Sequence, residues 1–172
     1  MRSAPLLILL AVSPAAANPL ELGASLGVNE DQAYQATSHS LGVFARAGIA
    51  PMISAQLEIA KLDNDQMGTR VRTGSTLLVL DLGHGALAPI AFGGVGLDST
   101  SSINADRRYA HVELGAGVEY RALGGLTLGA DVRIGTRKLL DDQPTGVLTY
   151  LEPLTLSEGQ YRSARITLGA RF

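Results

Sequence analysis

Residues 110–137 read AHVELGAGVEYR-ALGG-LTLGADVRIGTR and contain two runs in which apolar and polar residues alternate. In the first run, 110–121, every second residue from Ala110 to Tyr120 is apolar. The second run, 126–137, repeats the pattern. A period of two predicts β-strands, because an amphipathic helix needs a period near 3.6. The four residues ALGG between the runs predict a short turn that joins two antiparallel strands.

The same alternation recurs along most of the chain. Six runs show it clearly, at 20–28, 40–47, 53–60, 110–121, 126–137 and 162–172. Two further stretches, 70–82 and 87–98, also predict strands, but they are apolar on both parities in places. A β-bulge could switch their register. The sequence therefore leaves open which side chains of these two strands share a face.

The connections between the eight predicted strands alternate in length. Short turns are expected at 48–52, 83–86 and 122–125, and longer polar segments at 29–39, 63–69, 98–108 and 138–162. This alternation places all the long loops at one end and both chain termini at the other. We therefore predict an all-β fold, an eight-stranded antiparallel up-and-down barrel.

The N-terminal residues have the features of a secretory signal peptide. Arg2 supplies a positive start, 6–12 an apolar core, and 15–17 a small-residue cleavage site. We expect a signal peptide at 1–17 and a barrel domain at 18–172. The chain has no cysteine and a formal net charge of −2, so we expect no disulfide and no nucleic-acid partner.

Alternation alone does not say whether the apolar face points inward or outward. The polar face consists mostly of Gly, Ser and Thr with isolated charges, a composition that suits the interior of a narrow barrel better than a solvated surface. An Arg facing lipid near the bilayer midplane would cost about 2–4 kcal/mol. The longest runs have the length of a tilted strand that crosses a bilayer. The sequence thus predicts a transmembrane barrel whose apolar face is outside.

The last strand ends on an aromatic residue, Phe172, after strict alternation. This end resembles the C-terminal assembly signal of bacterial outer-membrane β-barrels. With the strand pattern, it makes the chain similar to the small barrels typified by the outer-membrane protein A transmembrane domain, OmpX and OmpW. The resemblance implies a Gram-negative cell outer membrane, contact with lipid and lipopolysaccharide, and insertion by the barrel-assembly machinery. The matching signal residues are Tyr161, Ala164, Ile166, Leu168, Ala170 and Phe172.

Charged residues on the predicted interior face should form ion pairs, because an unpaired buried charge is costly. Counting back from the turn at 122–125 brings Glu113 opposite Arg133 or one step away. Closure of the barrel places the first strand beside the last and brings Glu21 near Arg171, subject to the barrel's shear. The predicted interior network comprises Glu21, Glu113, Glu119, Asp131, Arg133, Arg165 and Arg171.

Eight strands leave an interior that side chains fill, so no open pore is expected. The last long loop carries apolar residues that either fold over the barrel mouth or form a surface for an extracellular protein partner. The candidate loop residues are Val147, Tyr150, Leu151 and Leu154. The leading functional hypothesis is a structural or surface-interaction role through the loops.

Two other functions stay open. One is a secreted, soluble, lipocalin-like barrel that binds a ligand. The other follows from the resemblance, since some eight-stranded outer-membrane barrels modify lipid A with a histidine and a serine or an acid. His111 lies two residues from Glu113 on the same face, and the simpler interpretation is an interior histidine bonded to that carboxylate. We expect no enzymatic activity, cofactor or metal site.

Overall fold

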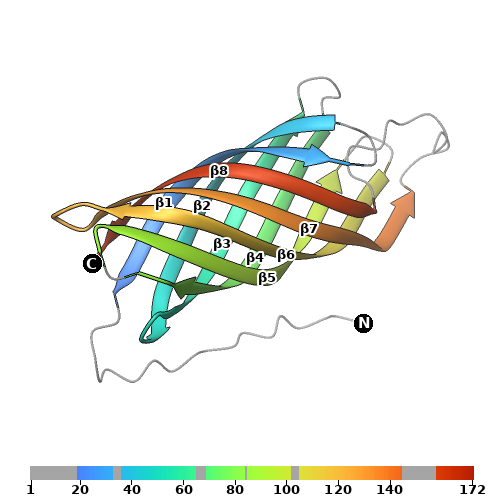
Figure 1. Ribbon diagram of the computed structural model, residues 1–172. Coiled ribbons are helices and arrows are strands. Elements are labelled where there is room, and N and C mark those ends of the chain that lie inside the picture. The colour runs from blue at the N-terminus through green and yellow to red at the C-terminus, as the bar shows by residue number, and fades with distance from the viewer. Residues whose placement is uncertain (1–18, 33–35, 65–68, 84, 102–104, 145–157) are drawn as a thin grey trace.

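The computed structural model describes residues 19–32, 36–64, 69–83, 85–101, 105–144 and 158–172. These residues form a single closed barrel in which each strand pairs with its sequence neighbours and the last pairs with the first (Figure 1). All pairings are antiparallel, as predicted. The strands are β1 (Leu20–Asp31), β2 (Ala36–Ala50), β3 (Ile53–Asn64), β4 (Thr69–Asp81), β5 (Leu87–Ser101), β6 (Ala105–Arg121), β7 (Leu126–Pro144) and β8 (Gly159–Arg171).

The strands are staggered around the barrel. A row of paired residues that starts at Glu21 on β1 passes once around the wall and returns to β1 at Asp31, ten residues further along. Such a stagger requires the strands to tilt relative to the barrel axis, as Figure 1 shows. The tilt brings residues from distant strands together inside the barrel.

The two ends of the barrel differ. Short turns and the C-terminus lie at one end, and the strand ends that flank the longer connections lie at the other (Figure 1). The turn at 122–125 is tight because Gly124 and Gly125 adopt φ values of 87° and 84°, which a side chain disfavours. The strands extend further toward the long-loop end than the sequence indicated. β1 continues to Asp31 and β7 to Pro144, because backbone pairing does not need alternating side chains.

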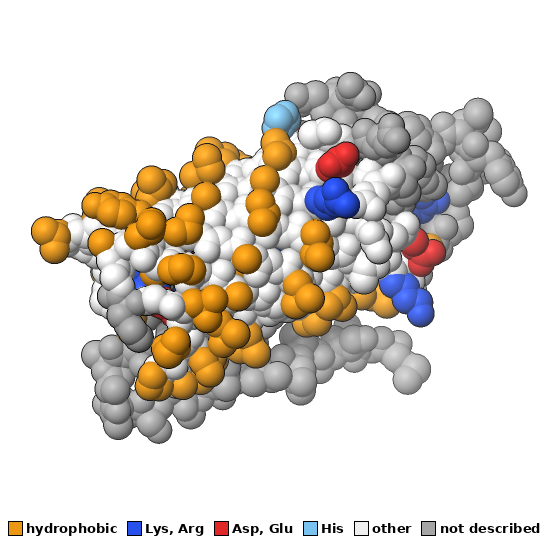
Figure 2. Space-filling model, in the orientation of Figure 1, with side chains coloured by type: hydrophobic (Ala, Val, Ile, Leu, Met, Phe, Trp, Pro, Cys, Tyr) orange, Lys and Arg blue, Asp and Glu red, His pale blue; other side chains and the backbone are white. Residues whose placement is uncertain are grey.

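Apolar side chains cover the outside of the barrel, and small or charged ones point inside. On β1, Leu26 is 62% exposed and its neighbour Ser25 is 4% exposed. Figure 2 shows hydrophobic side chains spread over the wall. A wall of exposed leucine, isoleucine and valine is suited to hydrocarbon, not to water. None of the described residues lies in a helix long and apolar enough to cross a membrane.

β4 and β5 have apolar side chains on both faces, which explains their ambiguous sequences. Leu77 and Val79 point inward and pack with Ile90 and Phe92 in a buried cluster. Leu78, between the first two, is 57% exposed on the outer wall. The register between β4 and β5 is continuous, so no bulge switches their faces. The predicted signal peptide, 1–17, lies outside the described residues.

Candidate functional site

The barrel interior holds a buried network of ion pairs, and Arg133 on β7 is at its centre. Its Nη1 lies 3.0 Å from Glu113 Oε1, its Nη2 3.3 Å from Glu58 Oε2, and its Nε 3.0 Å from Asp131 Oδ1. The guanidinium also lies over the ring of Phe92, 4.6 Å from its centroid. Three carboxylates around one guanidinium satisfy the hydrogen-bond demands of a charge that is buried away from water.

Glu113 and Arg133 are not directly opposite each other. Glu113 pairs with Gly135 in the register, and Arg133 pairs with Gly115, so the ion pair is diagonal. Diagonal neighbours on one face lie within reach of long side chains. The space that side chains would need at the glycines opposite both residues is taken by the rings of Phe92 and Tyr161.

Arg165 on β8 shares two of the three carboxylates around Arg133. It forms an ion pair with Glu58 on β3, and its Nη2 lies 3.2 Å from Asp131 Oδ2 on the neighbouring β7. Glu58 therefore accepts from both Arg133 and Arg165. Because β3 lies across the barrel from β7 and β8, these contacts bridge the interior.

At the short-turn end, the network closes the seam between the first and last strands. Glu21 on β1 and Arg171 on β8 are register partners, and their charged atoms lie 3.2 Å apart. Glu21 is also 3.5 Å from Arg46 and accepts from Thr127. Glu119 forms ion pairs with Arg46, Arg121 and Arg171. The structure thus brings every charged residue of the predicted interior network into at least one ion pair.

Toward the loop end, the contacts differ from the sequence expectation for His111. Its Nδ1 lies 3.2 Å from Asp98 Oδ1, and its Nε2 lies 3.0 Å from Ser75 Oγ. Glu113 instead bonds Arg133 and Tyr161. The expected His111–Glu113 bond is therefore wrong. The two residues share a strand face, but the stagger of β5 brings Asp98 closer to the imidazole.

Ser75, His111 and Asp98 have the residue types of a nucleophilic triad, but their surroundings do not suit catalysis. His111 and Asp98 are 3% and 2% exposed inside the barrel. His111 Nδ1 makes no aligned hydrogen bond, whereas an acid that orients a catalytic imidazole needs one. Asp98 is also held by Arg137, 2.7 Å away. The serine lines an interior cavity of about 30 Å³, too small for any acyl substrate.

The interior cavities lined by residues that the structure describes are small. Two interior cavities have volumes of about 30 and 10 Å³, enough for isolated water molecules. The apolar cluster of Leu77, Val79, Ile90 and Phe92 fills the space beside the smaller one. Ion pairs and apolar side chains together close the barrel.

Sequence reasoning missed several members of the network. Arg46, Asp81 and Asp98 each form a buried or half-buried ion pair. Arg46 lies on the face opposite the apolar one in the run 40–47, and that signal could have identified it. Asp98 closes a stretch of ambiguous parity, so no pattern in the sequence places it inside. No group of carboxylates and histidines among the described residues could hold a metal ion.

The residues matched to the assembly signal do not share one face. Ile166 and Leu168 are about 60% exposed on the outer wall, and Phe172 is 77% exposed at the chain end. Tyr161 instead points inward, is 5% exposed and donates a hydrogen bond to Glu113. Tyr161 therefore belongs to the interior face of β8. Ala170 is half-buried. The loop candidates Val147, Tyr150, Leu151 and Leu154 lie outside the described residues.

Known proteins resemble this chain in structure and not in sequence. No protein-family model and no curated protein sequence matches it. Among solved structures, Neisserial surface protein A superposes with a TM-score of 0.67 at 11% identity, over 91% of this chain and 98% of that chain. The N-terminal β-barrel domain of Pseudomonas aeruginosa OprF gives a TM-score of 0.62 at 14% identity, over 90% and 98%. A major outer membrane protein from Thermus thermophilus gives 0.62 at 12% identity, over 91% and 100%.

These matches cover nearly the whole of each chain, so they compare complete barrels. At such low identity they establish the fold, and the residues of the interior have to be read from this chain alone. The apolar wall and the paired interior charges independently match a barrel solvated by lipid. The chain is therefore an eight-stranded β-barrel with the fold of small outer-membrane proteins, and its apolar wall fits a barrel that spans a membrane.

Proposed function

We propose that this protein is a closed outer-membrane scaffold that acts through its long loops and conducts no solute through its interior. The observation that carries this proposal is the interior ion pairing, above all the contacts of Glu58 with Arg133 and Arg165 across the barrel. A barrel bridged in this way cannot widen without breaking buried ion pairs, and leaving such charges unpaired costs several kcal/mol.

Fractionation of cells and planar-bilayer recording test the scaffold role together. The protein should remain with the outer membrane after carbonate washing, and the unheated form should migrate differently from the heated form in a detergent gel. In planar bilayers, the purified barrel should give no steady conductance. Sustained, reproducible channel openings would show that the interior is a pore.

We further propose that the barrel is not an enzyme. The support comes from Ser75, whose hydroxyl lies inside the barrel beside a cavity of about 30 Å³. A fluorophosphonate probe should not label the folded protein, and lipid A from cells with and without it should have the same mass. Labelling that disappears in Ser75→Ala would make the serine a nucleophile and overturn this proposal.

The last long loop is the proposed site of surface interaction. Replacing its apolar residues Val147, Tyr150, Leu151 and Leu154 by serine separates two roles that the sequence leaves open. If the loop contacts a partner, cells that express this variant should no longer adhere to a second cell surface, and the barrel should stay closed. A loop that only covers the barrel mouth should leave adhesion unchanged.

A further inference from the structure

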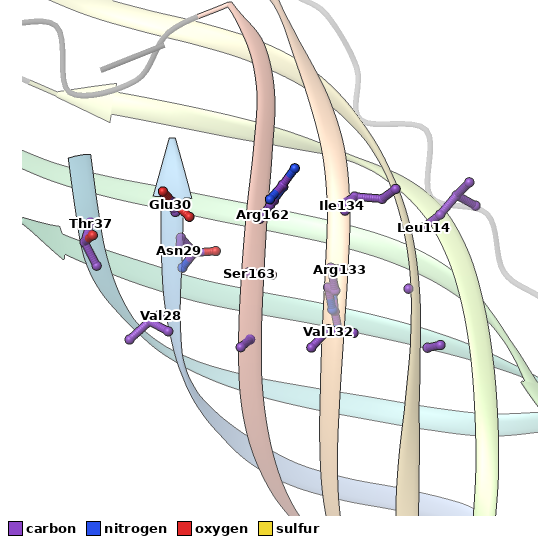
Figure 3. Close-up of a pocket in the computed structure, with 13 residues that line it drawn as sticks. Val28, Asn29, Glu30, Thr37, Leu114, Val132, Arg133, Ile134, Arg162 and Ser163 are labelled. Carbon is purple, nitrogen blue, oxygen red and sulfur yellow. The ribbon is translucent and has the colours of Figure 1, made fainter. Parts of the chain in front are cut away.

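A long groove runs along the lipid-facing wall across β6, β7, β8 and β1 (Figure 3). It consists of two adjoining depressions of about 750 and 680 Å³. Both are lined by Val28, Ala116, Val132 and Ala164. Ala116 and Ala164 are short, and the larger Leu114 and Ile134 project beside them, each just over 60% exposed. The hollow therefore comes from small residues on a wall of larger ones.

The groove has one apolar end and one polar end. On β8 its lining runs from Ile166 to Arg162, and on β1 from Leu26 to Glu30. Four steps at about 3.3 Å each give a length of about 13 Å along a tilted strand, so the groove spans part of one bilayer leaflet. Figure 3 shows Glu30 and Arg162 on the side of the groove toward the loop end of the barrel. An occupant would thus need an apolar tail and a polar head.

Exposed positive charges concentrate at the same end of the barrel. The described residues whose cationic side chains are exposed are Lys61, Arg72, Arg108, Lys138 and Arg162. All five lie in the halves of their strands nearest the long loops, and Figure 2 shows charged side chains mostly toward that end. The described exterior therefore carries its exposed cations, together with the exposed carboxylates of Glu30, Asp63 and Glu158, at one end and apolar side chains elsewhere.

Two of these cations extend the polar end of the groove. Arg108 lies on β6 beyond Leu114, and Lys138 lies on β7 beyond Ile134. Neither forms a hydrogen bond or ion pair with any other described residue, whereas Lys61 is 2.6 Å from Asp63. Their charges are therefore available to an anionic group at the membrane surface.

Arg162 is held in place by its own strand neighbours. The side-chain oxygen of Gln32, with the amide oriented to accept, lies 2.8 Å from Arg162 Nε and 3.3 Å from an Nη. Glu30 is its register partner on β1, and its carboxylate repels an anion on that side. An anionic head group at this site would therefore lie on the opposite side of Arg162, toward β7 and Lys138.

We propose that this groove binds one acyl chain of a phosphorylated lipid of the loop-side leaflet, with the lipid phosphate on Arg162 and Lys138. The proposal rests on the membrane placement given above and adds a specific lipid site to it. A second copy of the chain fits less well, because a symmetric contact would place the same cations against one another. Only an occupant with an apolar tail and an anionic head group matches both the apolar and the polar end of the groove.

Native mass spectrometry of the detergent-purified barrel tests the proposal. The probes are diphosphorylated lipid A, the same lipid without phosphates, and inorganic phosphate. We expect retention of the phosphorylated lipid, about tenfold weaker retention of the dephosphorylated one, since it loses the charge-assisted hydrogen bonds of its phosphates, and no adduct with phosphate alone. Equal retention of both lipids, or binding of free phosphate alone, would contradict the combined head-and-tail site.

Matched variants locate the site. Ala116→Leu with Ala164→Leu fills the groove and should weaken retention about tenfold, whereas Ala24→Leu, at an exposed exterior alanine outside the lining, should not. Arg162→Gln should weaken retention of the phosphorylated lipid as much as removal of its phosphates does. Arg72→Gln on distant β4 should leave retention unchanged. The proposal would be overturned if the groove-filling variant and Ala24→Leu weakened retention equally, or if Arg162→Gln and Arg72→Gln did. The heat-dependent gel shift, measured on each variant, shows separately whether the membrane barrel itself has formed.

Discussion

Arg133 Nη2 on β7 lies 3.3 Å from Glu58 Oε2 on β3, two strands that are four apart in a ring of eight. The pair therefore crosses the barrel from one side of the wall to the other. Both side chains are about 5% exposed. The charged network thus acts as an internal brace, and its removal should affect the stability of the whole barrel.

Glu58→Gln should destabilise the barrel strongly. The substitution keeps the shape of the side chain but removes the carboxylate that accepts from both Arg133 and Arg165. Breaking a buried pair costs about 3–5 kcal/mol, and we expect the lower end because both arginines retain Asp131. The measurement is a urea titration followed by the gel shift between folded and unfolded forms.

The control for Glu58 is an exposed pair on the same strand. Lys61 and Asp63 are 2.6 Å apart, but about half of each side chain is exposed. Asp63→Asn should therefore cost no more than about 1 kcal/mol. Similar urea midpoints for Glu58→Gln and Asp63→Asn would mean that the interior network does not stabilise the barrel.

Reversing the charge at Glu113 should lower the temperature at which the folded form is lost. Glu113→Lys places a cation beside Arg133 and removes the acceptor of the Tyr161 hydroxyl. The charge swap with Arg133→Glu should not rescue it, because the new glutamate would face Glu58 and Asp131. Glu113→Gln, a milder change, covers the case in which the reversal prevents folding.

Gel mobility after stepwise heating measures both Glu113 variants. An unchanged melting transition in Glu113→Gln and Glu113→Lys would contradict the pairing with Arg133. Full rescue by the swap would show that Arg133 depends on Glu113 alone and not on three carboxylates.

Phe172→Ala should separate assembly from stability. The Phe172 backbone N–H donates to the Leu20 carbonyl oxygen, 2.8 Å away, and the side chain is 77% exposed. Truncation should therefore change the free energy of unfolding by no more than about 0.5 kcal/mol. If the assembly machinery reads the aromatic, the amount of folded protein in cells should nevertheless fall severalfold. A variant that assembles normally in cells would remove Phe172 from the signal.

The sequence predicted the architecture well because lipid and a narrow interior impose opposite chemistry on alternate residues. It did not resolve β4 and β5, since Leu77 and Phe92 face an apolar patch of the interior while Leu78 faces lipid. An interior this narrow does not have to be polar throughout. The alternation of apolar and polar residues shows which side of a strand faces the interior only where the two sides of the barrel wall differ in polarity.

Contacts across the barrel were harder to predict than contacts between neighbouring strands. Glu21 with Arg171 and Glu113 with Arg133 follow from pairing and closure, which sequence can count. The contact of Glu58 with Arg165 depends on strand tilt and barrel diameter, which no local pattern encodes.

The aromatic residues show a related limit. The chain has only five tyrosines and three phenylalanines and no tryptophan, and the structure places several of these aromatic residues inside. Phe44, Phe92, Tyr109 and Tyr161 are all buried in the interior. Among the described aromatic residues, only Tyr120 and Phe172 face outward.

The most direct test of the outward-facing apolar wall is tryptophan fluorescence in bilayers that contain brominated lipids. The chain has no tryptophan, so single variants give a clean signal. Val132→Trp reports on the outer wall, Phe92→Trp on the interior, and Leu123→Trp on the exposed turn at 122–125. We predict strong quenching by brominated acyl chains at Val132 only. Strong quenching at Phe92, with Val132 quenched instead by aqueous acrylamide, would show that the apolar wall does not face lipid.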